Sequence, residues 1–309
     1  MEYSFPRYLL AKQSVDDRAL NKDVLAALRA EIAALQAAPA ASQPFRVIEI
    51  GAGIGTMLAR LLRWKVLPAE TEYTLVDSLP ENIAFARQWL PQWAQENGWS
   101  AETVSEEHIR FSACASVPSA WSVSIRLVQA DVFDFIHSFG SLPGDLLIAH
   151  AFLDLLPLPE SLPPLFSLVR KDGCAWFTIN FDGVTTFEPS FSPAVDALIE
   201  KLYHETMDTR PGGGDSRTGR HLFGYLQQNG VEILAAGASD WVVHPVGSSY
   251  LADEAYFLHF ILHFFETSLG HHPGLDSHLL AAWLQQRRAQ IERAELVYIA
   301  HQMDFLIRC

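Results

Sequence analysis

The feature that most constrains the fold is a glycine-rich turn that follows an apolar run. The run Val-Ile-Glu-Ile at 47–50 leads into Gly51, Gly53 and Gly55, three glycines at alternate positions. Glycine lets the backbone turn sharply and approach a ligand without side chains in the way. Residues 56–64 have the pattern of a helix whose N-terminus faces the same crevice. The segment predicts a strand, a ligand-binding turn and a helix, although a purely structural glycine turn has the same pattern.

The spacing of these glycines distinguishes two kinds of nucleotide site. The dinucleotide-binding fingerprint is G-x-G-x-x-G, which would require a glycine at position 56. That position holds Thr56. The sequence therefore disfavours a NAD-dependent oxidoreductase.

Polar residues also follow the next three apolar runs, each about one strand–helix unit further along the chain. Asp77 ends the second run, Asp131 follows the third, and His150 ends the fourth. Open α/β sheets place an acidic residue at such a strand end to bind a ribose. A carboxylate suits vicinal hydroxyls because it offers only hydrogen-bond acceptors. The pattern predicts a nucleoside site at the carboxyl edge of the sheet.

In this order and spacing, the motifs resemble those of class I S-adenosylmethionine (SAM) dependent methyltransferases over roughly residues 45–180. The resemblance implies an α/β fold: a mostly parallel, seven-stranded, Rossmann-like sheet with helices on both faces, and SAM as the cofactor. It also implies a role for each motif residue: Glu49 near the cofactor's amino group, Gly51, Gly53 and Gly55 along its methionine and ribose parts, Asp77 at the ribose hydroxyls, Asp131 at the adenine amino group, Val132 and Phe133 against the adenine ring, and His150 beside the sulfonium.

The chain divides into an N-terminal extension and one main domain. We expect an N-terminal helical extension over 1–44 and a SAM-binding domain over 45–309. An apolar stripe at helical spacing predicts one long helix from Ser14, its cap, to about Ala37, followed by a linker to Pro44. This helix could pack on the core, cover the cofactor cleft or pair with a second copy in a homodimer.

Strands alternate with helices in the main domain, which implies a parallel sheet joined by right-handed crossovers. The expected strands are 45–50, 72–77, 125–129, 145–149, 173–181, 231–236 and 295–307, and the expected helices are 56–64, 80–97, 132–139, 160–169, 193–207, 220–229, 252–269 and 276–293. We expect an irregular insertion at 98–122 and a loop at 182–192. The last two strands should form an antiparallel hairpin, split by a helical insertion over about 237–294.

Composition limits the partners of the chain. The formal net charge is −14 and no run of lysine and arginine occurs, so a nucleic-acid partner is not expected. Cys114, Cys174 and Cys309 lie far apart and form neither a disulfide framework nor a metal-binding pair. With no apolar signal-peptide core near the N-terminus, this predicts a cytoplasmic location. The apolar stretch 252–269 is interrupted by histidines and is shorter than the ~20 residues of a membrane span.

Two residues near the end of the fourth strand are candidates for a general base. His150 would lie beside the sulfonium, and its imidazole titrates near neutral pH. Asp154 follows four residues later. Each also has a structural alternative, as a packing histidine or as a carboxylate that caps the loop. The Asn-Pro-Pro-Tyr and Pro-Cys motifs of nucleobase methyltransferases are absent, which favours another kind of acceptor.

Acceptor-binding residues are expected in two segments. Arg210, Arg217 and Arg220, in the glycine-rich stretch 208–220, could bind a carboxylate or phosphate, unless this stretch is a solvated connector. Trp241 and Tyr256 could line an apolar acceptor pocket, unless they belong to the ordinary core.

No metal site is expected. His259 and His263 share one face of a helix, but no third ligand stands at a motif spacing from them. The leading hypothesis is an enzyme that transfers a methyl group from SAM to oxygen or nitrogen of a small molecule. A non-catalytic SAM-binding or protein-interaction module of the same fold, and a protein methyltransferase, remain alternatives.

Overall fold

A single mixed sheet runs through the molecule, which is known here from a computed structural model describing residues 3–38, 44–113, 121–138 and 143–309. The sheet has ten strands, and its order is β3-β4-β5-β2-β1-β6-β7-β10-β8, with β9 paired to β10. The strands are β1 Phe45–Ile50, β2 Glu70–Asp77, β3 Trp99–Thr103, β4 His108–Ala113, β5 Ser122–Gln129, β6 Gly144–His150, β7 Val169–Glu188, β8 Glu232–Ala238, β9 Trp241–Val243 and β10 Val297–Arg308.

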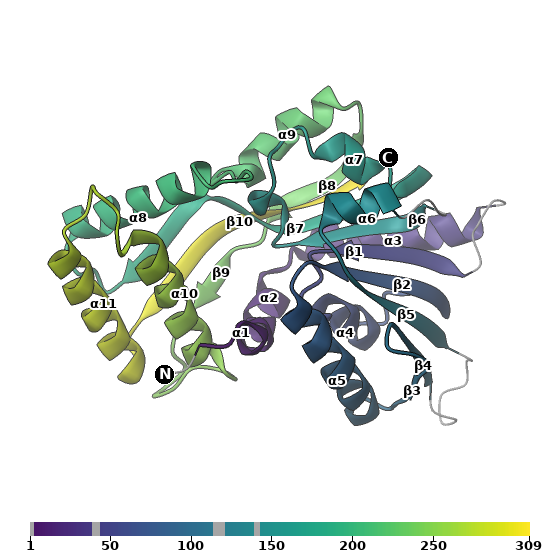
Figure 1. The fold of residues 1–309 in the computed structure, drawn as a ribbon, viewed down its shortest axis with the longest axis horizontal. Coiled ribbons are helices and arrows are strands. Elements are labelled where there is room, and N and C mark those ends of the chain that lie inside the picture. The colour runs from purple at the N-terminus through teal and green to yellow at the C-terminus, as the bar shows by residue number, and fades with distance from the viewer. Residues whose placement is uncertain (1–2, 39–43, 114–120, 139–142) are drawn as a thin grey trace.

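Helices flank this sheet on both sides (Figure 1). They are α1 Phe5–Ala11, α2 Gln13–Ala19, α3 Lys22–Ala37, α4 Thr56–Arg63, α5 Pro80–Glu96, α6 Val132–Ser138, α7 Leu162–Phe166, α8 Pro193–Asp208, α9 Thr218–Gln228, α10 Glu254–Leu269 and α11 Ser277–Glu292, with a 3-10 turn η1 at Leu153–Leu155. The predicted α/β class and the mostly parallel order are confirmed.

The centre of the sheet is parallel. Strands β5, β2, β1, β6 and β7 run in one direction, while β10 lies antiparallel between β7 and β8. The final strand thus forms the predicted antiparallel arrangement with β8, although a long helical segment separates the two in sequence. Because parallel strands end at one edge, the turns after β1, β2, β5 and β6 meet there.

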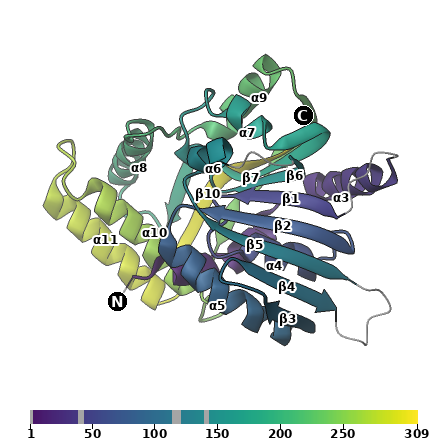
Figure 2. The same cartoon turned by 45° about the vertical axis from the view of Figure 1, so that its right-hand side comes forward.

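Each face of the sheet has its own hydrophobic core. Helices α6, α7 and α9 cover one face, where Phe135, Leu165 and Leu222 are buried. Helices α3, α4 and α5 cover the other, and Leu28 of α3 is fully buried there. Helix α5 packs on β2, β3, β4 and β5, and Figure 2 shows it beside these strands. The apolar stripe of α3 packs on the chain's own sheet, which accounts for this stripe without a second copy.

Strands β7 and β10 are much longer than the strands beside them. They extend beyond the parallel sheet, and α8, α10 and α11 pack around the extension, on the left in Figure 1. We call these three helices the cap. The cap joins the same core as α1 and α2, because Tyr8 of α1 stacks on Phe257 and Phe260 of α10.

The N-terminal region differs from the prediction of one helix from Ser14 to Ala37. It forms α1, α2 and α3, and the break before α3 lies at Leu20 and Asn21. The side chain of Asn21 accepts hydrogen bonds from the backbone of Asp23 and Val24, so Asn21, not Ser14, caps the long helix. An internal cap of this kind is easily missed when apolar residues continue at helical spacing on both sides.

Three further predictions about elements were wrong. The segment 98–122, expected to be irregular, contains the hairpin β3–β4, which extends the sheet beyond β5. Residues 182–188, expected to be loop, continue β7, and Gly183 with φ +73° lies within this strand. Short β9 adds a third unexpected strand, so the sheet has ten strands instead of seven. Helix α7 is shorter than predicted.

Some predictions fall on residues outside the described ranges. These are Cys114 and most of the linker that ends at Pro44. Within the described ranges, no helix is both long and apolar enough to cross a membrane.

Candidate active site

A cavity of about 610 Å³ opens at the carboxyl edge of the parallel strands. One wall consists of the glycine turn after β1 and the residues that follow β2, β5 and β6. The opposite wall comes from α1, β7, α8, α10 and β10. Segments from both ends of the chain therefore enclose the place where the sequence predicts cofactor and acceptor.

The glycine turn has a conformation that other residues rarely adopt. Gly51, Gly53 and Gly55 have φ values of +60°, +56° and +83°. A Cβ on Gly51 would lie 2.2 Å from the ring of Phe152, and one on Gly53 would lie 2.9 Å from Leu9. Gly51 and Gly53 line the cavity, whereas Gly55 forms the N-terminal boundary of α4. The turn is thus a narrow cradle in which any side chain would fill the space.

Glu49 lies at the base of this cradle. Its side chain is buried, lines the cavity and accepts a hydrogen bond of 2.7 Å from the Tyr73 hydroxyl. Burial raises the pKa of Glu49 to about 8, although the Tyr73 hydrogen bond and the charge of Arg60 oppose the shift. A buried carboxyl group with one protein partner can accept a ligand's ammonium group.

Asp77 connects the turn to the start of α5. Its Oδ2 accepts a 2.7 Å hydrogen bond from the Gly53 backbone, and its Oδ1 accepts from the Leu79 backbone and the Asn82 amide. Burial raises the pKa of Asp77 and these hydrogen bonds oppose the rise. The carboxylate lines the cavity, so the group predicted to bind a ribose also shapes the glycine turn.

The residues predicted to bind the adenine are only partly brought together. Asp131 and Val132 line the cavity, and Asp131 accepts a 2.8 Å hydrogen bond from the Phe133 backbone at the start of α6. Phe133 itself does not line the cavity. It packs against the core on the α6 face of the sheet. Its predicted contact with the adenine ring is therefore not supported by its position.

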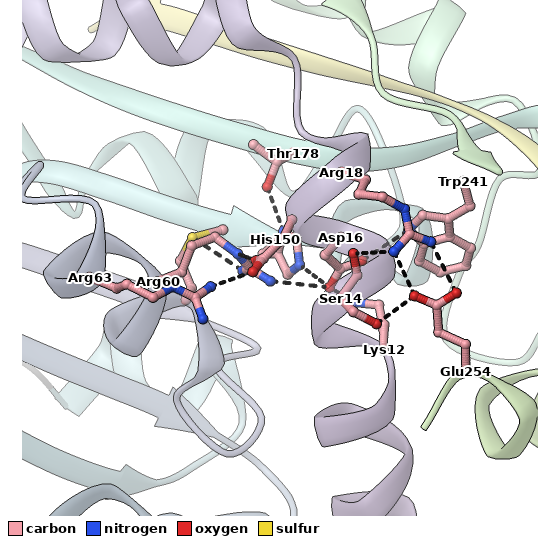
Figure 3. Close-up of polar contacts among 12 residues, drawn as sticks. Lys12, Ser14, Asp16, Arg18, Arg60, Arg63, His150, Thr178, Trp241 and Glu254 are labelled. Carbon is pink, nitrogen blue, oxygen red and sulfur yellow. Dashed lines mark hydrogen bonds and ion pairs between the residues drawn. The ribbon is translucent and has the colours of Figure 1, made fainter. Parts of the chain in front are cut away.

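Both ring nitrogens of His150 have partners. Nε2 lies 2.9 Å from Oδ2 of Asp16 in α2, and Nδ1 lies 2.7 Å from the Thr178 hydroxyl (Figure 3). Because a carboxylate can only accept, Nε2 carries a proton and neutral His150 accepts from Thr178 through Nδ1. Burial lowers the pKa of His150 to about 4, with Lys12 adding to the shift and Asp16 opposing it. This gives His150 the role of a link between the sheet and α2.

Asp16 is the centre of a buried polar cluster that sequence reasoning missed. Besides His150, it contacts Lys12 Nζ at 3.1 Å, Trp241 Nε1 at 2.9 Å and Arg60 at 3.7 Å. Burial alone would raise the pKa of Asp16, but Lys12, His150 and Arg60 together lower it below its ordinary value. The cluster joins α2 to α4, β6 and β9. Its members lie far apart in sequence, so no local motif could reveal it.

Asp154, the other predicted base, has a more exposed and less satisfied carboxylate. It lies in η1 and lines the cavity. Its buried Oδ1 has no hydrogen-bond partner among the described residues. Burial raises the pKa of Asp154 to about 6, and the charges of Arg210 and Lys12 oppose the rise. A carboxylate of this kind can accept a proton from a bound ligand near neutral pH.

The predicted acceptor residues are mostly elsewhere. Arg220 is held by the carboxylate and carbonyl of Asp182, and Arg217 lines a separate open groove between α8 and α9. The Tyr256 hydroxyl accepts a hydrogen bond from the Ser4 backbone, and Tyr256 does not line the cavity. Of the five predicted residues, Trp241 and Arg210 line it.

Aromatic residues form much of the cavity wall opposite the glycine turn. They come from α1, β7, α8, β9, α10 and β10, and they are Phe5, Tyr8, Phe181, Tyr203, Trp241, Phe264 and Tyr298. Sequence reasoning identified only Trp241 among them.

Within the described ranges, no group of three or more histidine, cysteine or acidic residues could hold a metal ion. His259, one of the two histidines considered as metal ligands, lies 3.1 Å from Glu292.

Comparison with known proteins gives similarities of fold. No protein-family model matches the sequence, and no curated protein matches it. Among solved structures, a SAM-dependent methyltransferase from Thiobacillus denitrificans in complex with S-adenosyl-L-homocysteine (SAH) is 13% identical, with 99% of each chain covered and a TM-score of 0.47. One from Geobacter sulfurreducens, also with SAH, is 12% identical, with 99% of each chain covered and a TM-score of 0.43. Mycolic acid cyclopropane synthase CmaA1 is 11% identical, covers 100% of this chain and 99% of its own, and has a TM-score of 0.45.

Proposed function

We propose that this protein is an enzyme that transfers a methyl group from SAM to oxygen or nitrogen of a small organic acceptor. The observation that carries the proposal is the convergence of four features on one cavity: the narrow glycine turn, buried Glu49, the carboxylates Asp77 and Asp131 at neighbouring strand ends, and Asp154 after β6. The residues from Glu49 to Val132 that the resemblance assigns to the cofactor line this cavity, apart from Gly55, and Phe133 lies off it.

The residues present fit the chemical groups of SAM. Glu49 offers a carboxyl group to the amino end of the methionine part, and the glycine turn leaves room for the chain beside it. Asp77 and Asp131 offer acceptors to the ribose hydroxyls and the adenine amino group. When bound, SAM supplies a methyl group on a positively charged sulfur, which is already activated for transfer.

The protein's own contribution is to position the acceptor and to take its proton. Asp154 lines the cavity, its buried Oδ1 has no hydrogen-bond partner among the described residues, and it is the residue we assign as general base. As the new bond forms, the proton of the acceptor's O–H or N–H group moves to this carboxylate. His150 holds α2 against the sheet edge and is a positioning residue.

A small acceptor suits the shape of the site. Tyr8 and Lys12 of the N-terminal region line the cavity, and both are buried. The cavity is therefore covered on the side opposite the sheet edge, which favours a small molecule over a protein chain. Together with the acidic composition, this supports a small-molecule partner and speaks against nucleic acid.

Calorimetric titration with SAM, SAH and NAD tests the proposal. We expect micromolar binding of both sulfur compounds and no binding of NAD, because the turn lacks the dinucleotide fingerprint. Glu49→Gln should weaken SAH binding, whereas Glu96→Gln, an exposed change at the end of α5, should not. Failure of SAM and SAH to bind the wild-type protein would overturn the cofactor assignment.

A further inference from the structure

Three tyrosines that line the cavity have hydroxyl groups without a partner in the part of the chain that the structure describes. Tyr8, Tyr203 and Tyr298 all line the cavity, and no hydrogen bond to their hydroxyl groups occurs among the described residues. Tyr8 is 6% exposed and Tyr298 is 4% exposed. Other buried tyrosines do have partners: Tyr73 donates to Glu49 and Tyr256 contacts the Ser4 backbone. These three hydroxyls are instead left to the cavity that the tyrosines line, where a polar group of a ligand can pair with them.

The three tyrosines line the same cavity as Asp154. Burial raises the pKa of Tyr8 well above its ordinary value, and the charges of Asp16, Tyr298, Tyr203 and Asp154 raise it further. Burial likewise raises the pKa of Tyr203 to about 12, with Asp154 adding to the rise and Arg210 opposing it. The three groups therefore keep their protons and can donate hydrogen bonds at neutral pH.

Two cations line the same cavity. Lys12 is 5% exposed and its ammonium group, with three donors, forms one ion pair with Asp16 at 3.1 Å. Arg210 also lines the cavity, and its guanidinium group has no hydrogen-bond or ion-pair partner among the described residues. Ammonium and guanidinium groups only donate. The part of the cavity that we assign to the methyl acceptor thus has more hydrogen-bond donors than hydrogen-bond acceptors. Asp154 is the acidic residue on this part of the wall.

We propose that the methyl acceptor is a small carboxylic acid with an apolar body, whose carboxylate is bound by Tyr203, Tyr298 and Arg210 while its O–H or N–H group faces Asp154. The proposal rests on the proposed function and narrows its substrate class. Phe181, Trp241 and Phe264 provide apolar walls for the body of the molecule.

The balance of charge favours a single negative charge on the ligand. Lys12 is already paired with Asp16. When Asp154 accepts the proton of the nucleophile it becomes neutral, and the positive charge of Arg210 then balances one carboxylate. A phosphate carries more negative charge than this set of groups would neutralise. A cationic amine is disfavoured because it also donates hydrogen bonds and would lie beside the donor groups of Arg210 and the tyrosines.

Three probes of similar size test the class of the ligand: benzoate, benzamide and benzylamine, titrated by calorimetry into the full-length protein with and without SAH. We expect benzoate to bind at least tenfold more tightly than either of the others, because its charged oxygens accept from several donors. Equal binding of benzamide, stronger binding of benzylamine, or no binding of benzoate would each overturn the proposal.

Conservative variants test the residues. Tyr203→Phe and Tyr298→Phe should each weaken benzoate binding about tenfold, the effect of one hydrogen bond to a charged group, and leave SAH affinity and Tm unchanged. Tyr250→Phe is the matched control, because its hydroxyl donates to the Leu296 carbonyl at 2.9 Å outside the cavity. This control should lower Tm without changing benzoate binding. Unchanged benzoate affinity in both cavity variants would show that Tyr203 and Tyr298 do not bind the carboxylate.

The two proposals fail separately. Loss of SAH binding with intact benzoate binding would remove the cofactor assignment and leave the acid pocket standing. Normal SAH binding with no preference for benzoate would leave the methyltransferase proposal intact and reject the carboxylic acid.

Discussion

Glu49 should make the stability of the protein depend on pH. Burial raises its pKa from 4.5 to about 8. Below pH 4.5 the group is neutral in both folded and unfolded chains, so its full contribution to stability is present. Between pH 4.5 and 8 the unfolded chain ionises and the folded chain does not, so this contribution is lost as pH rises, by up to about 1.4 kcal/mol per pH unit.

Glu49→Gln removes this titration. We therefore expect the free energy of unfolding of the variant to exceed that of the wild type by an amount that grows between pH 5 and 8, measured by urea denaturation without ligand. Glu96→Gln, at an exposed position, provides the control. If plots of the free energy of unfolding against pH are parallel for wild type and Glu49→Gln, Glu49 is already ionised in the folded protein.

Asp154 should govern the rate of methyl transfer. Its pKa of about 6 means that the carboxylate is ionised, and able to take a proton, only above that pH. We expect kcat to rise through pH 6 and then level off. Asp154→Asn should lower kcat by about 10²- to 10⁴-fold, the usual contribution of a general base, with little change in SAH affinity.

The control for Asp154 is Asp134→Asn, an exposed carboxylate of α6. Both variants are compared by product formation with the acceptor that screening identifies. A change in kcat of only a few-fold for Asp154→Asn, with the pH profile retained, would mean that the enzyme acts by positioning alone.

At the scale of elements, the N-terminal helices are attached to the cap by two ion pairs of different kinds. Arg18 binds the fully buried carboxylate of Glu254 at 2.6 Å and 3.1 Å, and Ser14 shares this carboxylate (Figure 3). Arg7 binds Asp253 at the surface, with both side chains about half exposed. The first pair should hold α2 in place, because a buried carboxylate without its cation is costly.

Arg18→Ala should therefore destabilise the protein by at least about 2 kcal/mol. It should also speed SAH dissociation several-fold, since α2 follows directly on α1 and Lys12, which line the cavity. Arg7→Ala should cost less than about 1 kcal/mol, as exposed pairs do. Stopped-flow displacement of SAH and urea denaturation measure the two effects. Similar dissociation rates for Arg18→Ala and wild type would argue against this role of the pair.

The same elements show what local pattern can predict. The parallel strands and the helices between them were predicted well, because each has its own apolar pattern and its own turn residues. Two errors came from features without a strong local signal. Asn21 caps α3 in the middle of a continuous apolar stripe, and Gly183 lies within β7 although it resembles a turn residue. In both cases contacts with distant parts of the chain decide the structure.

For the whole molecule, the two halves of the cavity differ in how far sequence could predict them. In the half that we assign to the cofactor, most predicted residues do line the cavity, because each stands directly after a strand, at a fixed place in a repeated unit. The acceptor half is assembled from Tyr8, Tyr203 and Tyr298, which lie on α1, α8 and β10. Nothing in the neighbourhood of any one of them points to the other two, so Arg217, Arg220 and Tyr256 were chosen in their place.

This assembly predicts a particular pattern of protection when ligand binds. The cavity touches α1, the glycine turn and η1, while β3–β4 and α11 contribute no lining residue. The contact of Leu9 with Gly53 and that of Asp16 with His150 join the N-terminal helices to the cofactor wall. Ligand binding that tightens this wall should therefore slow local opening of α1 and α2 as well.

Hydrogen–deuterium exchange with and without SAH measures this coupling. We expect slower exchange in residues 5–19, in the glycine turn and in η1, and no change in β3–β4 or α11. In Arg18→Ala the protection of residues 5–19 should shrink while that of the glycine turn persists, because the cradle itself is intact. Protection limited to the glycine turn in the wild-type protein would mean that the N-terminal helices cover the cavity without responding to the cofactor.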